Sequence, residues 1–130
     1  MILVSTEVLE NLLQGNAESR LQLGDVLEDL TWKGKKLCVS IHSVQSNINI
    51  LTKIKNWPDQ LSTAFHEIIP NQFSHFRNAN SIMNSNSIQF DLAMDISVAE
   101  QSGCNSILTL KKYPKEFTHL QFVPILGKSN

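Results

Sequence analysis

The sequence lacks any marked excess of charge, because 11 basic and 12 acidic residues leave a formal net charge of -1. This balance argues against a protein whose main task is non-specific binding to nucleic acid, which requires a strongly basic surface. Hydrophobic residues make up 42% of the chain and charged residues 18%, proportions typical of a folded globular protein rather than a disordered one. For 130 residues we expect one domain over 1–126 and a frayed tail at 127–130.

Long hydrophobic runs are also missing, and none approaches the ~18 residues that a membrane-spanning helix needs. The opening segment MILVSTEVLENLL has no basic residue and is interrupted by Glu7 and Glu10, so we expect no signal peptide. Cysteine occurs only twice, at Cys38 and Cys104, without the spacing of a metal site. We expect two buried free thiols, with a disulfide as the less favoured alternative. Together these features predict a cytoplasmic protein without a membrane partner.

Sequence signatures of several enzyme classes are absent. The chain has no glycine-rich phosphate loop, no dinucleotide-binding fingerprint and no serine-hydrolase elbow around Ser5. Neither cysteine has an adjacent base, as a nucleophile would need. His42 follows a predicted strand, and we expect a surface or capping role for it. The other histidines lack metal-ligand spacing: His66, His75 and His119.

Short apolar runs alternate with segments of helical periodicity along the chain. The apolar runs predict strands at 1–4, 37–40, 106–110 and 120–123. The periodic segments predict helices at 6–14, 18–30, 41–54, 59–69, 71–83 and 88–102. Helical crossovers between short, fully apolar strands imply a parallel sheet covered by helices, which is an α/β fold.

The segment Ile88–Lys112 contains the clearest of these patterns. It carries Asp91 and Asp95 four residues apart, which places both on one face of the predicted helix. In parallel sheets, functional residues gather at the carboxyl ends of the strands. The residues at those ends are Ser5-Thr6-Glu7, Ser40-Ile41-His42 and Leu110-Lys111-Lys112.

Several short motifs occur in an order that points to one family. The opening MILVSTEVLENLL is similar to an M-I-L-x-D-T-N-x-L start, and Asp91-Leu92-Ala93 is similar to a D-A-L helix start. Glu100 to Thr109 is similar to a segment of helix, glycine, aspartate and strand, and Phe117 precedes the last predicted strand. In this order the motifs resemble the PIN domain, the nuclease fold of VapC-type toxins. The resemblance implies a three-layer sandwich with a short central parallel sheet of four to five strands flanked by helices.

The resemblance also implies a catalytic site, in which three or four carboxylates hold Mg²⁺ or Mn²⁺ for phosphodiester hydrolysis. Most of those carboxylates are replaced here. Ser5 takes the place of the first aspartate and Glu7 that of an asparagine. Ser46 takes the place of the glutamate, and Lys111 lies where further aspartates are expected. Only Asp91 keeps its place, so we interpret the site as degenerate, with no catalytic residue.

Two functions remain open at this stage. The first is a non-catalytic binding or regulatory module, a decayed toxin without a cofactor, in which Lys111 or Lys112 points into the acidic pocket and forms a salt bridge with Asp91 or Glu7. The alternative is a Mg²⁺- or Mn²⁺-dependent ribonuclease with a rearranged metal site made of Glu7, Asp91 and Asp95.

The two functions imply different partners. The resemblance implies a homodimer and a groove on residues 6–30 that receives an antitoxin-like peptide. An apolar face is consistent with that groove: Leu9, Leu12, Leu13, Leu21 and Leu27. RNA is a weaker candidate, because the basic set in 32–36 with Lys53 and Lys55 is more typical of a solvated turn.

Overall fold

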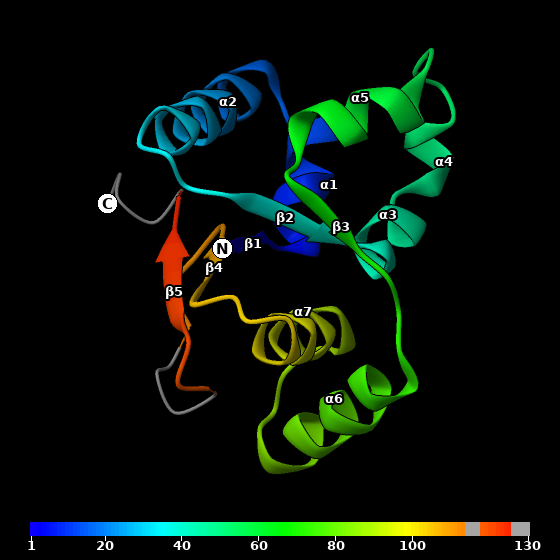
Figure 1. The fold of residues 1–130 in the computed structure, drawn as a ribbon, viewed down its shortest axis with the longest axis vertical. Helices are drawn as coiled ribbons and strands as arrows, with labels where there is room; N and C mark the ends of the chain where they lie inside the picture. Colours follow the sequence, from blue (N-terminus) through cyan, green and yellow to red (C-terminus); the bar gives the residue numbers. More distant parts are fainter. Residues whose placement is uncertain (114–117, 126–130) are drawn as a thin grey trace.

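The computed structural model describes residues 1–113 and 118–125. Phe117, the end of the predicted domain at residue 126 and the predicted tail at 127–130 lie outside the described residues. Within them, five strands form one all-parallel sheet in the order β3-β2-β1-β4-β5 (Figure 1). The strands are β1 (Ile2–Val4), β2 (Leu37–Ser40), β3 (Glu67–Ile69), β4 (Ser106–Thr109) and β5 (Gln121–Pro124).

Helices cover both faces of this sheet. The group on one face comprises α1 (Thr6–Gln14), α2 (Ala17–Trp32), α3 (Ile41–Ser46), α4 (Ile48–Leu51) and α5 (Trp57–Ala64). The group on the other face comprises α6 (Phe73–Ser85) and α7 (Phe90–Gln101), drawn below the sheet in Figure 1. The predicted α/β fold, with a central parallel sheet flanked by helices, is confirmed.

Alternation along the strands divides the core into two parts. Because successive side chains of a strand point to opposite faces, Ile2 and Val4 of β1 pack in the cluster that contains α1, α2 and α5. Leu3 packs instead with Ile96 and other residues of α7. Every residue of the central strands β1, β2 and β4 is buried, as expected for parallel strands covered on both faces. In the described part of the chain, no helix has the length and apolar character to cross a membrane.

The predicted helix 59–69 is wrong in its second half. Helix α5 ends at Ala64, and Phe65 takes an extended conformation that leads into β3. Pro70 disfavours a helical conformation at Ile69, and the edge of β2 offers hydrogen-bond partners to this segment, with Ile68 opposite Val39. Pairing with a distant strand therefore overrides the local helical periodicity.

Two further predictions about the helices need correction. The predicted helix 41–54 is divided at Asn47, whose side-chain amide donates to the carbonyl of Ser43 at 2.9 Å between α3 and α4. The sequence pattern places Leu21 on the apolar face of the predicted groove, but Leu21 is 69% exposed, whereas Leu23 is fully buried. The side of α2 that packs against the core is therefore not the one that its leucine pattern predicts.

Candidate functional site

The carboxyl end of β1 carries Ser5, the residue that replaces the first aspartate of the resembled site. Ser5 is fully buried, and its hydroxyl oxygen accepts from the amide of Val8 at 3.3 Å. Its own amide donates to the carbonyl of Leu108 on β4 at 3.2 Å. Ser5 therefore serves as the N-cap of α1, a position where a short hydroxyl side chain satisfies an otherwise unpaired amide.

Asp95 lies beneath this cap as a buried carboxyl, only 1% exposed. It accepts two hydrogen bonds of 2.9 Å from Thr6, one from the backbone amide and one from the hydroxyl. The Thr6 hydroxyl also lies 2.7 Å from the hydroxyl of Ser43 on α3. Burial raises the pKa of Asp95 to about 8, and the nearby charges of Asp91 and Glu7 act in the same direction. Asp95 is thus a structural acid that joins α7 to the first residue of α1.

Glu7 is bound to the segment after β4. Its Oε1 accepts from the amide of Leu110 at 3.1 Å, and its Oε2 accepts from the Tyr113 hydroxyl at 3.0 Å. Burial is the main cause that raises the pKa of Tyr113, with the Glu7 charge second. Both oxygens of Glu7 are therefore occupied by donors of the chain itself.

Asp91 begins the same helix as Asp95 but lies at the surface, with 55% of its side chain exposed. Its Oδ1 lies 2.8 Å from Nε2 of His42, whose ring packs edge-on against Phe90 with centroids 5.4 Å apart. This pairing corrects the expectation of a surface or capping role for His42. The sequence places His42 at the carboxyl end of β2, where functional residues gather. It does not indicate Asp91 as the partner, because 49 residues separate the two.

The predicted lysine salt bridge is not formed. Among the residues that the structure describes, the ion pairs are Lys33–Asp29, His42–Asp91 and His119–Glu100. Lys111 instead places its Nζ 5.6 Å from the centre of the Tyr113 ring, a cation–π distance. The reason is competition, because Glu7 already accepts from two neutral donors and Asp91 already pairs with His42.

These groups surround a cavity of about 510 Å³, hereafter the acidic cavity. Lys111 is among the residues that line it, without a salt bridge to Glu7 or Asp91. Ser46 lies in an adjoining cavity of about 210 Å³ that it shares with Asp91 and Thr6. The acidic cavity is lined by Glu7, Glu10, Ser87, Ile88, Gln89, Asp91, Leu92, Asp95, Lys111 and Tyr113.

The residues at this cavity do not fit Mg²⁺ or Mn²⁺. These ions require several convergent oxygen ligands. In the described ranges, no three His, Cys, Asp or Glu side chains lie close enough together to hold a metal ion. Glu7, Asp91 and Asp95 each point to a separate partner within the chain.

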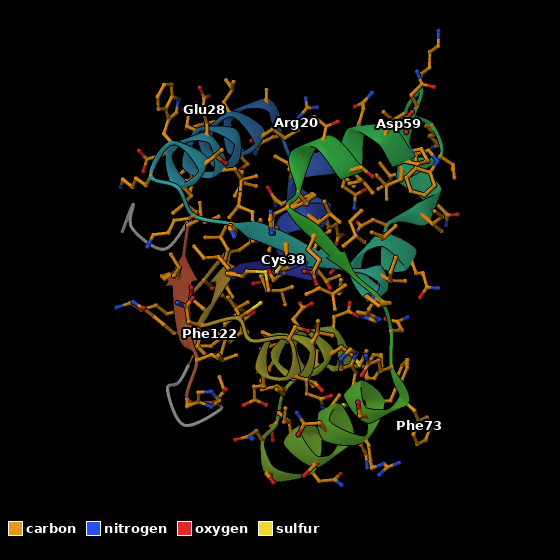
Figure 2. The ribbon with its side chains drawn as sticks, viewed as in Figure 1. Arg20, Glu28, Cys38, Asp59, Phe73 and Phe122 are labelled. Atoms are coloured by element: carbon orange, nitrogen blue, oxygen red, sulfur yellow. The ribbon has the colours of Figure 1, made fainter. Side chains whose placement is uncertain are left out.

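A second candidate site is a groove of about 280 Å³ on the opposite side of α1, hereafter the apolar groove. Leucines of α1 and α2 form one part of it, and α5 supplies Trp57 and Leu61, a contribution that the sequence pattern did not reveal. Glu28 of α2 lines it, and Figure 2 shows Glu28 on α2 and Asp59 on α5. Leu21 is not part of it. The lining residues are Leu9, Leu12, Leu13, Leu27, Glu28, Thr31, Leu37, Leu51, Ile54, Trp57, Gln60, Leu61, Ala64 and Phe65.

Comparison with known proteins finds similar solved structures but no similar sequence. No protein-family model and no curated protein sequence matches the chain. It is similar to a chain of FitAcB from Neisseria gonorrhoeae, with a TM-score of 0.65 and 14% identity over 95% of this chain and 96% of that one.

Two further solved structures show the same similarity. A chain of FitAB bound to an IR36 DNA fragment gives a TM-score of 0.72 and 13% identity over 100% of this chain and 99% of that one. A chain of VapBC2 from Rickettsia felis, bound to a DNA fragment from their promoter, gives 0.63 and 15% identity over 94% and 97%. At such identities the similarity establishes a shared fold.

Proposed function

We propose that this chain is a cytoplasmic PIN-domain protein of the toxin–antitoxin type that acts as a non-catalytic binding or regulatory module. The shared fold with chains of FitAcB and VapBC2 supports this role, together with the motifs that resemble those of VapC-type toxins. The present chain covers nearly the whole length of each chain that it matches, which is consistent with a single PIN-like domain over 1–126.

The apolar groove is the observation that carries this proposal. Its lining is mostly aliphatic or aromatic, and Leu12, Leu13 and Trp57 remain only partly buried within it. An unfilled apolar groove between helices suits the apolar face of an amphipathic helix, which inserts side chains spaced three and four residues apart. We therefore assign the groove to a helical segment of an antitoxin-like partner.

The contacts at the acidic cavity support the absence of catalysis. A metal-dependent nuclease needs free carboxylate oxygens aimed at one point. Here Ser5 caps a helix, Asp95 is enclosed, and Glu7 binds two donors of its own chain. Lys111 adds a positive charge that would repel a divalent cation. The cavity thus stabilises the fold in place of binding a catalytic ion.

A homodimer is the second element of the proposal. Three phenylalanines lie on the surface formed by α6 and the start of α7: Phe73 is 73% exposed, Phe76 39% and Phe90 42%. The rings of Phe76 and Phe90 stack with centroids 6.4 Å apart, and Figure 2 shows Phe73 directed away from the molecule. Aromatic side chains are enriched at protein interfaces, which supports a contact between two copies at this surface.

Binding to the apolar groove can be followed through Trp57. Trp32 is the only other tryptophan and is 83% exposed, so the Trp32→Phe chain reports on Trp57 alone. We expect a synthetic amphipathic helix with leucines at positions i, i+3, i+4 and i+7 to shift the Trp57 emission to shorter wavelength with a saturating dose response. In this background, Leu12→Glu is expected to weaken binding at least ~10-fold by placing a charge in the groove.

The matched control is Leu21→Glu, the same change at an exposed leucine of α2 outside the groove. This variant should bind the peptide as the Trp32→Phe chain does, and circular dichroism should show that both variants stay folded. Equal weakening by the two substitutions, or a peptide response without saturation, would contradict the assignment of the groove.

Addition of Mg²⁺ or Mn²⁺ tests the absence of a catalytic metal. An ion that binds the native state at 100 times its Kd stabilises it by about 2.7 kcal/mol. We expect a change in Tm of less than about 1 °C, measured by thermal unfolding, and no cleavage of a fluorescent RNA. Cleavage that requires the ion and disappears in Asp91→Asn would favour the ribonuclease with Glu7, Asp91 and Asp95 as ligands.

A further inference from the structure

The two cysteines of the chain meet on the α7 side of the sheet. Cys38 lies on β2 and is fully buried, and Cys104 lies just before β4 and is 5% exposed. Their sulfur atoms are 3.4 Å apart. Figure 2 shows Cys38 near the centre of the molecule, between the sheet and α7. Nothing in the proposed binding function uses this pair of thiols.

Backbone contacts on both sides hold the two sulfur atoms close to each other. Cys38 pairs with Leu3 of β1, and its thiol also lies 3.5 Å from the carbonyl of Ile2. The turn that carries Cys104 is attached to the residue directly before β1, because the amide of Asn105 donates to the carbonyl of Met1 at 3.1 Å. Both cysteines are therefore anchored to β1 or the residue directly before it, from opposite sides, which keeps their side chains facing each other.

We propose that Cys38 and Cys104 form an oxidative modification site, where a small peroxide converts the dithiol into an intramolecular disulfide. The bond length in a disulfide is about 2.05 Å, so the sulfurs must approach by a little more than an ångström. The proposed bond therefore requires the two side chains to rotate toward each other. The product would connect β2 to the turn before β4 across β1, between strands that are not hydrogen-bonded to each other.

The reaction has two steps with defined roles. The thiolate of one cysteine attacks an oxygen of hydrogen peroxide, the O–O bond breaks, and a sulfenic acid and hydroxide form. The second sulfur then attacks the sulfenic sulfur and expels hydroxide, and the protons of the two thiols convert both hydroxides to water. Two thiols are oxidised and one peroxide is reduced.

Cys104 is suited to the first step. It is the more accessible of the two, and its side-chain contact with Cys38 lowers the pKa of Cys104. The same contact is the main cause that raises the pKa of Cys38, and burial adds to it. Cys38 therefore remains protonated and acts second, as the resolving thiol.

The test exposes the folded, reduced chain to hydrogen peroxide, followed by alkylation under denaturing conditions and mass spectrometry. We expect monomeric chain that lacks two hydrogens, resists alkylation, and yields one linked peptide pair containing Cys38 and Cys104. Because the chain has only two cysteines, any disulfide within one chain must be this one. Oxidation is expected to raise Tm by about 10 °C, and dithiothreitol should reverse the increase.

Cys38→Ser and Cys104→Ser provide the matched controls, since each retains one thiol. Peroxide should convert the remaining thiol to sulfenic or sulfinic acid without raising Tm. The proposal is overturned if the folded wild-type chain keeps both thiols alkylatable, or if its only disulfides join separate chains. The linked peptide is measured in the wild-type chain, so the test does not depend on the folding of either variant.

Discussion

Replacing Asp95 with alanine is expected to lower the free energy of unfolding by about 3 kcal/mol. The substitution leaves the amide and the hydroxyl of Thr6 without their common acceptor in an environment that water does not reach. It also leaves a small void at a position that is only 1% exposed. Urea unfolding followed by circular dichroism should show a lower midpoint with an unchanged slope.

Asp91→Ala is the matched control, because Asp91 lies one turn earlier on the same helix and is exposed. Its pair with His42 is partly solvated, so the loss should stay within about 1 kcal/mol. Asp95→Asn should fall between the two, since an amide keeps one acceptor oxygen. Equal losses for Asp91→Ala and Asp95→Ala would show that the buried hydrogen bonds of Asp95 contribute nothing specific.

Raising the pH from 5 to 8 is expected to destabilise the chain through Asp95. Burial raises the pKa of this carboxyl in the folded state to about 8, whereas an unfolded aspartate titrates near ~3.9. Between these values the folded state holds a proton that the unfolded state has lost, so stability falls as pH rises. The slope approaches about 1.4 kcal/mol per pH unit, and the decline ends above the folded pKa.

His75 contributes with the opposite sign in the same range. Burial lowers its pKa, so the folded state releases its proton earlier than the unfolded state and stability from this group rises with pH. The informative measurement is therefore the difference between wild type and Asp95→Asn in urea unfolding at several pH values. That difference should change by up to about 4 kcal/mol from pH 5 to pH 8. A constant difference would exclude a shifted Asp95.

The sequence predicts the elements of this fold better than their partners. Buried parallel strands are visible as short apolar runs, because burial on both faces leaves no alternation to detect. Strand β3 was missed, since Glu67-Ile68-Ile69 continues a helical pattern and becomes a strand only by pairing with β2. The same limit applies to Leu21, whose exposure depends on how α2 lies against the sheet.

At the candidate site, too, the sequence predicts the positions of residues along the chain but not their contacts. Asp91 and Asp95 were located correctly on one helix, and their four-residue spacing follows from the sequence alone. Their different surroundings do not, because Thr6 and His42 reach them from segments 89 and 49 residues away. The expected lysine salt bridge failed for a related reason: side-chain charge predicts attraction, but the donors already in place decide which contact forms.

The junction of Thr6, Ser43 and Asp95 has a consequence for the motions of the molecule. It joins α1 and α3, which cover one face of the sheet, to α7, which covers the other. Neither helical layer can separate from the sheet without breaking the buried hydrogen bonds of this junction. Amide exchange in the two layers should therefore be governed by one cooperative opening event rather than by two independent ones. A partner that seats on one layer would then slow exchange in the other without touching it.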